Sequence, residues 1–195
     1  REVLAKQPGA SIIFEVKSSQ ALAEEIERAG GRPVMWKTGH SLIKGKMKEE
    51  HAPLAGEMSG HLFFADEYYG FDDAVYASCR LARLLARSSQ SVRQMLSDVP
   101  KYYSTPEMRL DCPDDRKFEV VEALAAAFRR TYDTIDIDGV RVLFGDGWGL
   151  VRASNTQPVL VVRFEARTPE RLEAIKHGVL SKLAEYPFVK LPADA

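Results

Sequence analysis

Short apolar runs alternate with amphipathic segments in the first half of the chain. The runs are rich in β-branched and aromatic residues, which predicts strands, whereas the segments between them repeat apolar residues at helical spacing. The predicted strands are residues 12–16, residues 33–36 and a pair flanking residues 56–61, and the predicted helices are residues 20–29, 42–50 and 72–86. This alternation predicts an α/β domain with a parallel or mixed sheet.

The helix predicted at residues 72–86 has the strongest pattern of these. Aspartates stand at its start and arginines near its end, as the helix dipole favours. Its apolar residues recur on one face, which we expect to be buried. This face comprises Ala74, Ala77, Leu81 and Leu84 or Leu85.

Residues 99–106 interrupt the alternation. They contain two prolines and no apolar period, which is typical of a linker. We therefore expect an α/β domain over residues 1–98, a linker or hinge over residues 99–106, and a second domain over residues 107–195.

The second half follows a different order: a strand, a helix, three strands and a helix. This order predicts a smaller antiparallel-sheet domain with helices on one face. Thr168 and Pro169 are typical of the cap and first residue of a helix. The apolar face of the first helix is Phe118, Val121, Ala125, Phe128 and Tyr132, and that of the last is Leu172, Ile175, Val179 and Leu183.

Composition and charge exclude several classes of protein. With 45% hydrophobic and 28% charged residues, the 195-residue chain is typical of a globular protein, and its formal net charge of −1 gives no reason to expect nucleic acid or an acidic membrane as a partner. No apolar run approaches the roughly 20 residues of a membrane-spanning helix. Cys79 and Cys112 lie far apart in no metal-ligand spacing, so we expect a reducing, cytoplasmic location.

The segment Gly56-Glu57-Met58-Ser59-Gly60-His61 contains polar chemistry that folding does not require. Its glycines allow close backbone approach to a ligand. The carboxylate can accept hydrogen bonds from two vicinal sugar hydroxyls, and the serine hydroxyl can both donate and accept. The alternative is an ordinary strand, turn and strand with incidental polar residues.

Two further polar residues follow predicted strands. Lys17 comes after the first strand and His40 after the second. If these strands are parallel, both residues lie at the carboxyl edge of the sheet, where ligands bind in open α/β folds. Taken singly, a lysine or histidine after a strand is more often an ordinary surface residue, so the prediction depends on both residues falling at strand ends together with residues 56–61.

A second polar group lies between two strands of the C-terminal half. It consists of Arg152, Ala153, Ser154, Asn155 and Thr156. An arginine fork, hydroxyls and turn N–H groups together favour an anion, above all a phosphate. The alternative is a hairpin turn, in which Ser, Asn and Thr are common for conformational reasons.

Metal and nucleotide motifs give weaker signals. His40, His51, Glu57 and His61 have no closed zinc spacing, and we predict no metal site in this chain. The glycine-rich residues 145–149 stand between two strands with no helix after them, which favours a hairpin turn over a nucleotide loop.

Five segments of the chain occur in one order: residues 37–41, 56–61, 70–73, 152–156 and 158–166. Together they resemble the C-terminal half of the bacterial phosphomannomutases/phosphoglucomutases of the α-D-phosphohexomutase family. The resemblance spans nearly the whole chain, and methionine at position 58 resembles the mannose and glucose mutases, since glucosamine mutases typically have glutamine there.

This resemblance implies the third and fourth of four domains, the fourth with a TATA-binding-protein-like topology. It implies that Glu57 and Ser59 bind the O3 and O4 hydroxyls of the sugar. Met58, Gly60 and His61 would complete that loop, and Lys17 and His40 would line the cleft. The non-transferred phosphate would be held by the loop Arg152, Ala153, Ser154, Asn155 and Thr156, where alanine replaces a common serine and removes a minor contact.

The resemblance also implies what lies outside this chain. The family's phosphoserine motif (Thr-x-Ser-His-Asn-Pro-like) and magnesium loop (Asp-Gly-Asp-x-Asp-Arg-like) are absent from the sequence. We therefore expect no catalytic residue here, a chain inactive alone, and Mg²⁺ bound by the second of the missing N-terminal domains of the same protein. The expected partner is a phosphosugar, converted from hexose 1-phosphate to hexose 6-phosphate through a hexose 1,6-bisphosphate. The alternative is a stand-alone, non-catalytic sugar-phosphate binding module.

Overall fold

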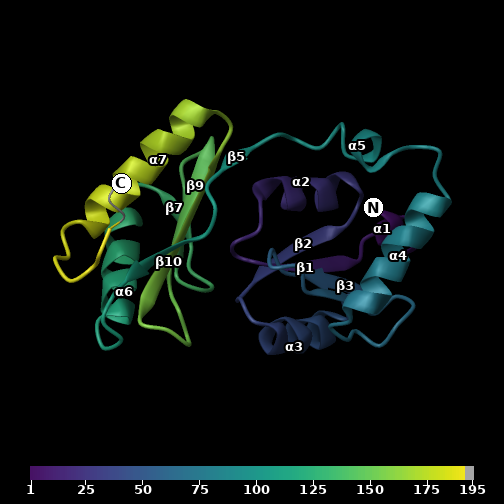
Figure 1. The fold of residues 1–195 in the computed structure, drawn as a ribbon, viewed down its shortest axis with the longest axis horizontal. Helices are drawn as coiled ribbons and strands as arrows, with labels where there is room; N and C mark the ends of the chain where they lie inside the picture. The colour runs from purple at the N-terminus through teal and green to yellow at the C-terminus, as the bar shows by residue number, and fades with distance from the viewer. Residues whose placement is uncertain (192–195) are drawn as a thin grey trace. The chain divides into compact units, whose positions relative to one another are not determined.

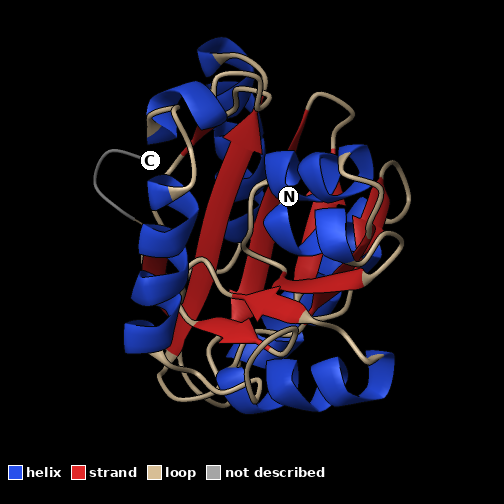
Figure 2. Ribbon diagram, turned by 90° about the vertical axis from the view of Figure 1, so that its right-hand side faces the viewer, coloured by secondary structure: helices blue, strands red, loops and turns tan. Residues whose placement is uncertain are grey.

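The structure, a computed structural model, describes residues 1–191 and divides into two compact units. Unit 1 is Arg1–Lys101, and unit 2 begins at Tyr102. Both units can be followed along the chain in Figure 1, and their helices and strands are distinguished in Figure 2. Residues 192–195, the end of the second domain as the sequence predicts it, lie outside the described residues.

Unit 1 contains a four-stranded sheet in the order β2-β1-β3-β4. The central strand β1 pairs in parallel with β2 and β3, and β4 is antiparallel to β3. The predicted mixed sheet is therefore confirmed. The strands are β1 (Ser11–Glu15), β2 (Arg32–Trp36), β3 (Leu54–Gly56) and β4 (Leu62–Phe64).

Helices pack on both faces of this sheet because successive residues of β1 point to opposite sides. Ile13 packs with Ile43 and Met47 of α3 on one face. Ile12 and Phe14 pack on the other face with α1 and α2, which Figure 1 shows on the side opposite α3. The helices of unit 1 are α1 (Glu2–Lys6), α2 (Gln20–Arg28), α3 (His40–Glu50), α4 (Ala74–Ala86) and α5 (Val92–Met95).

The predicted buried face of α4 is wrong. Leu81 is 54% exposed, and the buried residue of this helix is Arg80, at 4%. The Arg80 guanidinium donates to both oxygens of Asp66, at 2.9 and 2.8 Å, and lies 4.7 Å from the centre of the Phe64 ring. The long side chain of arginine has an apolar stem and a charged end, so it takes the place beside the sheet that the pattern assigned to leucine.

Unit 2 contains an antiparallel sheet in the order β5-β10-β9-β8-β7, with β6 also paired to β10. The predicted antiparallel sheet is therefore confirmed. Part of the segment predicted as a linker is the strand β5, since Tyr103 and Ser104 pair with the end of β10. The strands are β5 (Tyr103–Ser104), β6 (Met108–Asp111), β7 (Asp133–Ile135), β8 (Val140–Leu143), β9 (Gly147–Ala153) and β10 (Val159–Ala166).

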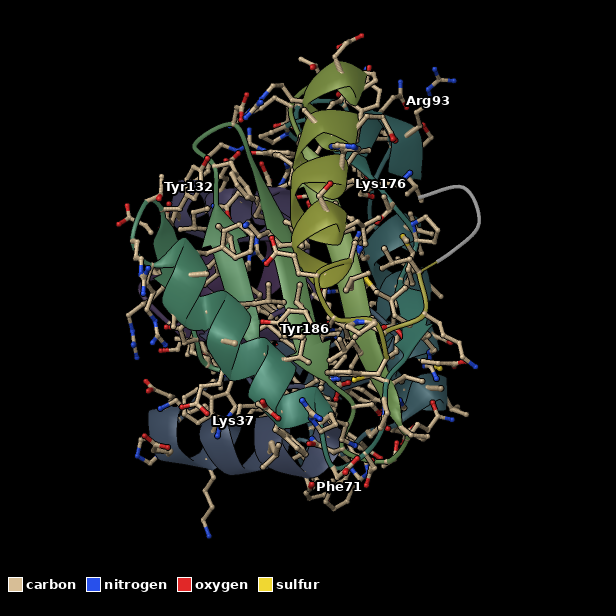
Figure 3. All side chains as sticks on the ribbon, turned by 90° about the vertical axis from the view of Figure 1, so that its left-hand side faces the viewer. Lys37, Phe71, Arg93, Tyr132, Lys176 and Tyr186 are labelled. Carbon is tan, nitrogen blue, oxygen red and sulfur yellow. The ribbon has the colours of Figure 1, made fainter. Side chains whose placement is uncertain are left out.

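Helices α6 (Lys117–Phe128) and α7 (Pro169–Leu183) of unit 2 cover one face of this sheet, as predicted. Figure 3 looks onto that face, with Lys176 labelled on α7. Thr168 caps α7 by accepting a hydrogen bond from the Arg171 N–H, and all four predicted apolar residues of α7 are buried. The prediction for α6 is partly wrong, since Phe118 is 59% exposed. Within residues 1–191, no helix has the length and apolar character that crossing a bilayer requires.

Candidate functional site

The carboxyl edge of the unit 1 sheet gathers the first group of predicted site residues. Lys17 follows β1, His40 begins α3 after β2, and Glu57 follows β3 directly. Because β1 is parallel to both β2 and β3, the three strands end at the same edge. Lys17 is buried there, whereas His40 is exposed.

The loop at residues 56–61 is the tip of the β3–β4 hairpin. The Glu57 N–H donates to the His61 carbonyl, and the Gly60 N–H donates to the Glu57 carbonyl, both at 2.9 Å. Gly60 has a φ of 97°, a conformation that favours glycine. The turn leaves Met58, Ser59 and His61 exposed at the sheet edge, where a ligand can reach them.

Glu57 carries a buried polar atom that the described protein does not satisfy. Its Oε1 is buried and has no hydrogen-bond partner among residues 1–191. The pKa of this carboxyl is raised above its ordinary value mainly by burial, and the nearby Glu15 carboxylate raises it further. Three nearby groups act in the opposite direction: His61, Lys17 and His40. An orphaned acceptor among such groups is a place where the hydroxyls of a ligand can donate.

His61 is oriented by a residue outside its own loop. Its Nδ1 lies 2.7 Å from Asp72 Oδ2. Asp72 reaches this position because it pairs as an isolated bridge with Phe63 of β4. This contact occupies the Nδ1 side of the ring, so the Nε2 side is left for other partners. The His40 ring lies 6.4 Å from the His61 ring, centre to centre.

The second group of predicted site residues lies at the β9–β10 hairpin of unit 2. Arg152 is buried and forms a fork with Asp138, donating from Nε at 3.0 Å and from Nη2 at 3.2 Å. Ala153 packs in the apolar core of unit 2 and offers no polar side chain. The guanidinium is therefore held in one orientation by a carboxylate on the neighbouring strand connection.

The loop after Arg152 is organised by one hydroxyl. Ser154 Oγ accepts hydrogen bonds from the N–H groups of Thr156, at 3.3 Å, and Gln157, at 3.2 Å. Lys117 is buried and donates to the Gln157 carbonyl at 3.1 Å, which fixes the far end of the loop. Asn155 and Thr156 stay exposed.

Gly139 allows Asp138 to reach Arg152. Its φ is 80°, and an added Cβ would lie 2.4 Å from the Val151 carbonyl and 2.6 Å from Arg152 Cα. Gly145 has nearly the same φ, 82°, with nothing within 4 Å of the same position. The two glycines therefore separate the cost of the left-handed backbone from the cost of close packing.

We expect Gly139→Ala to lower the free energy of unfolding by about 3 kcal/mol, and Gly145→Ala by only about 1 kcal/mol. The smaller loss is expected because a Cβ at position 145 meets no neighbouring atom, so only the left-handed backbone conformation is unfavourable there. Urea denaturation of both variants measures the difference. Equal losses in the two variants would show that the close approach at Gly139 is unimportant.

The structure adds three site residues that the sequence analysis missed: Glu15, Asp72 and Asp138. Each accepts hydrogen bonds from a predicted site residue or its loop. A signal existed for Glu15, a lone carboxylate in an apolar strand, and for Asp138, next to a turn glycine. The structure thus brings the predicted site residues together in two groups, one in each unit. The first combines Lys17, His40 and residues 57–61, and the second is residues 152–156 with Asp138.

Comparisons with known proteins identify the family to which both units belong. Residues 1–103 match the family profile described as phosphoglucomutase/phosphomannomutase, alpha/beta/alpha domain III, and residues 107–182 match that of the C-terminal domain. A phosphomannomutase/phosphoglucomutase of Pseudomonas putida is 47% identical over 194 residues, which is 98% of this chain and 42% of the relative. The chain thus spans less than half the length of such relatives.

Solved structures give the same result. A phosphoglucomutase/phosphomannomutase family protein from Burkholderia thailandensis superposes with a TM-score of 0.82 and 44% identity, over 93% of this chain and 39% of that one. The N-acetylphosphoglucosamine mutase of Aspergillus fumigatus, solved with glucose 1,6-bisphosphate, has a TM-score of 0.66 over 93% of this chain and 40% of that one. At 13% identity it shows the fold alone.

Two adjacent domain matches cover most of the chain, and they divide it near the boundary between its two compact units. The chain therefore belongs to the phosphoglucomutase/phosphomannomutase family, of which it comprises the third and C-terminal domains.

Proposed function

We propose that this chain is the substrate-binding half of a phosphohexomutase, an isomerase that interconverts the 1-phosphates and 6-phosphates of glucose and mannose. Unit 1 binds the hydroxyls of the sugar and unit 2 binds its non-transferred phosphate. A hexose 1,6-bisphosphate is the intermediate of this proposed reaction. The proposal places the protein in the cytoplasm, which agrees with its two free cysteines.

The observation that carries the proposal is the unpartnered Oε1 of Glu57. A buried acceptor without a donor costs free energy, so its retention is explained if a ligand supplies the donor. A pyranose presents vicinal hydroxyls that can donate to one carboxylate and accept from Ser59, Lys17 or a histidine. These groups stand at one sheet edge, so they can act on one sugar ring.

The phosphate assignment rests on Arg152 and the loop that follows it. The fork with Asp138 fixes the plane of the guanidinium before any ligand arrives, which lowers the entropy cost of binding. The exposed Asn155 and Thr156 add polar groups beside it. Such a combination suits a phosphate, which accepts several charge-assisted hydrogen bonds at once.

The residues of this chain do not fit a resident magnesium ion. Over the range 1–191, no three His, Cys, Asp or Glu side chains stand where they could hold a metal. We therefore assign Mg²⁺ to another domain of the complete protein, and we assign the phosphoryl-transferring serine likewise because this sequence contains no Ser-His-Asn-Pro segment. The structure of the fungal neighbour with GlcNAc-6P and magnesium is in keeping with such a cofactor in the family. In this proposal, the residues described above bind and orient the substrate.

Calorimetric titration of the purified chain tests the proposal. Glucose 1-phosphate and mannose 1-phosphate are expected to bind weakly, and free glucose more weakly still, because it lacks the phosphate contacts. A coupled assay for glucose 6-phosphate is expected to show no turnover. Turnover by the purified chain, or equal affinity for glucose and its phosphate, would contradict the proposal.

A stand-alone binding module makes the same binding prediction, so a different observation must separate the two functions. The reading frame upstream of Arg1 does so. A Ser-His-Asn-Pro segment in that frame favours the enzyme, and a stop codon directly before this segment favours the module.

A further inference from the structure

Glu15 is a buried carboxylate at the end of the central strand β1, with no exposed surface. Its Oε2 accepts hydrogen bonds from the Lys17 N–H, at 2.7 Å, and from Thr38 Oγ1, at 3.3 Å. Its Oε1 accepts from the Met58 N–H, at 3.1 Å. One side chain therefore bonds to three different connections of unit 1, those that follow β1, β2 and β3.

Each of these connections carries part of the proposed sugar site. The first contains Lys17 itself, and the second leads from Thr38 through Gly39 to His40. The third is the hairpin tip, in which Met58 stands between Glu57 and Ser59. We propose that Glu15 is a positioning residue that holds the three sugar-binding connections in register with one another. The identity of the ligand in this inference rests on the proposed function. The holding of the three connections by Glu15 rests on the hydrogen-bond geometry alone.

The chemistry of a carboxylate suits this task. An ionised carboxylate only accepts hydrogen bonds, and its two oxygens can serve several donors at once. Two of the donors at Glu15 are backbone N–H groups, so the bonds fix the main chain of the loops and not merely side chains. The remaining donor is the side chain of Thr38, and Gly39, with a φ of 129°, lies between Thr38 and His40. A contact at Thr38 therefore limits the freedom that this glycine introduces.

Glutamine at position 15 tests the inference because it keeps the size of the side chain but replaces one acceptor oxygen with an N–H₂ donor. At least one backbone N–H then faces another donor. We expect Glu15→Gln to weaken glucose 1-phosphate binding by about 10-fold, the scale of one lost hydrogen bond to a charged group. Binding of inorganic phosphate is expected to stay unchanged, since its site lies in unit 2.

The matched control is Glu50→Gln in the same unit. Glu50 pairs with the side chains of Arg32 and Lys46 and bonds to none of the three connections. We expect this variant to bind glucose 1-phosphate as the wild type does. Equal losses in the two variants, or no loss in Glu15→Gln, would overturn the proposal.

Hydrogen exchange of the wild-type chain gives a readout independent of ligand. The Met58 amide is expected to exchange at least 10-fold more slowly than the Ser59 amide at the same hairpin tip, and to lose this protection in Glu15→Gln. Equally fast exchange of both amides in the wild type would refute the positioning role, even if the variant did not fold. Protection at Met58 in a chain that binds no phosphosugar would instead support the register and contradict the proposed function.

Discussion

Arg152→Ala is expected to weaken binding of glucose 1-phosphate by about 100-fold or more, because it removes a buried, hydrogen-bonded charge from the proposed phosphate site. The loss has a second cause. In this variant Asp138 loses the two hydrogen bonds that it accepts from Arg152, so its carboxylate charge is no longer balanced by the arginine and repels the ligand phosphate. Inorganic phosphate should lose affinity in parallel, which titration calorimetry with both ligands measures.

The double variant Arg152→Ala/Asp138→Asn separates these two causes. Removing the carboxylate charge is expected to recover part of the affinity, roughly 10-fold, although the arginine is still missing. No recovery would mean that Asp138 does not act on the ligand.

A second arginine of the same unit serves as the control. Arg171 forms an equivalent fork with Asp146, at 2.6 Å from Nε and 3.0 Å from Nη2, but the pair is exposed and lies away from the β9–β10 loop. Arg171→Ala is expected to bind both ligands as the wild type does. If Arg171→Ala lost as much affinity as Arg152→Ala, the effect would come from net charge and the phosphate site would be misplaced.

The strands and helices of this chain were largely predictable because each depends on a local pattern. The apolar runs at β1 and β2 and the cap at Thr168 are visible within a few residues of sequence. The edge location of Lys17 and His40 followed from those elements once the sheet was parallel. Packing of helix faces was less predictable. Arg80 lies beside the sheet because its partner Asp66, 14 residues away, neutralises it, and no periodicity records that pairing.

The residues that orient the site were not predictable for the same reason. Asp72 bonds to His61 across 11 residues, and Glu15 bonds to Met58 across 43 residues. The local sequence indicates other roles for both residues. Asp72 is typical of an acidic residue at the start of a helix, and Glu15 interrupts an apolar strand. The motif at residues 56–61 thus identified the groups that face a ligand, whereas the carboxylates that hold them are defined by tertiary contacts.

Glu57→Gln is expected to reduce affinity for glucose 1-phosphate by about 100-fold, because a charged acceptor of two sugar hydroxyls becomes a neutral amide. Affinity for inorganic phosphate should not change, since Glu57 belongs to unit 1. The same variant should be more stable than the wild type at pH 7. Burial raises the pKa of Glu57 above its ordinary value of 4.5, so the ionised form is the costly one in the folded state.

The sign of this stability difference gives the pH dependence. The cost of ionised Glu57 is absent while the carboxyl is protonated, and it develops as pH rises through 4.5 and the raised folded pKa. The gain in Glu57→Gln is therefore expected at pH 7 and should vanish below about pH 4. Glu67 provides a control of opposite sign, because Lys6 and Arg83 lower its pKa to about 2.

Glu67→Gln is accordingly expected to be less stable than the wild type at pH 7, with the loss disappearing as pH falls from 4.5 toward 2. Calorimetric unfolding of the wild type and both variants at pH 3, 5 and 7 provides the measurement. If Glu57→Gln lost stability at pH 7 as Glu67→Gln does, Glu57 would be a satisfied structural carboxylate, and its role as a sugar acceptor would have to be abandoned. If Glu57 binds the sugar, Glu57→Gln should gain stability and lose sugar affinity together. The unpaired carboxylate lowers the stability of the ligand-free protein until a ligand hydroxyl donates to it.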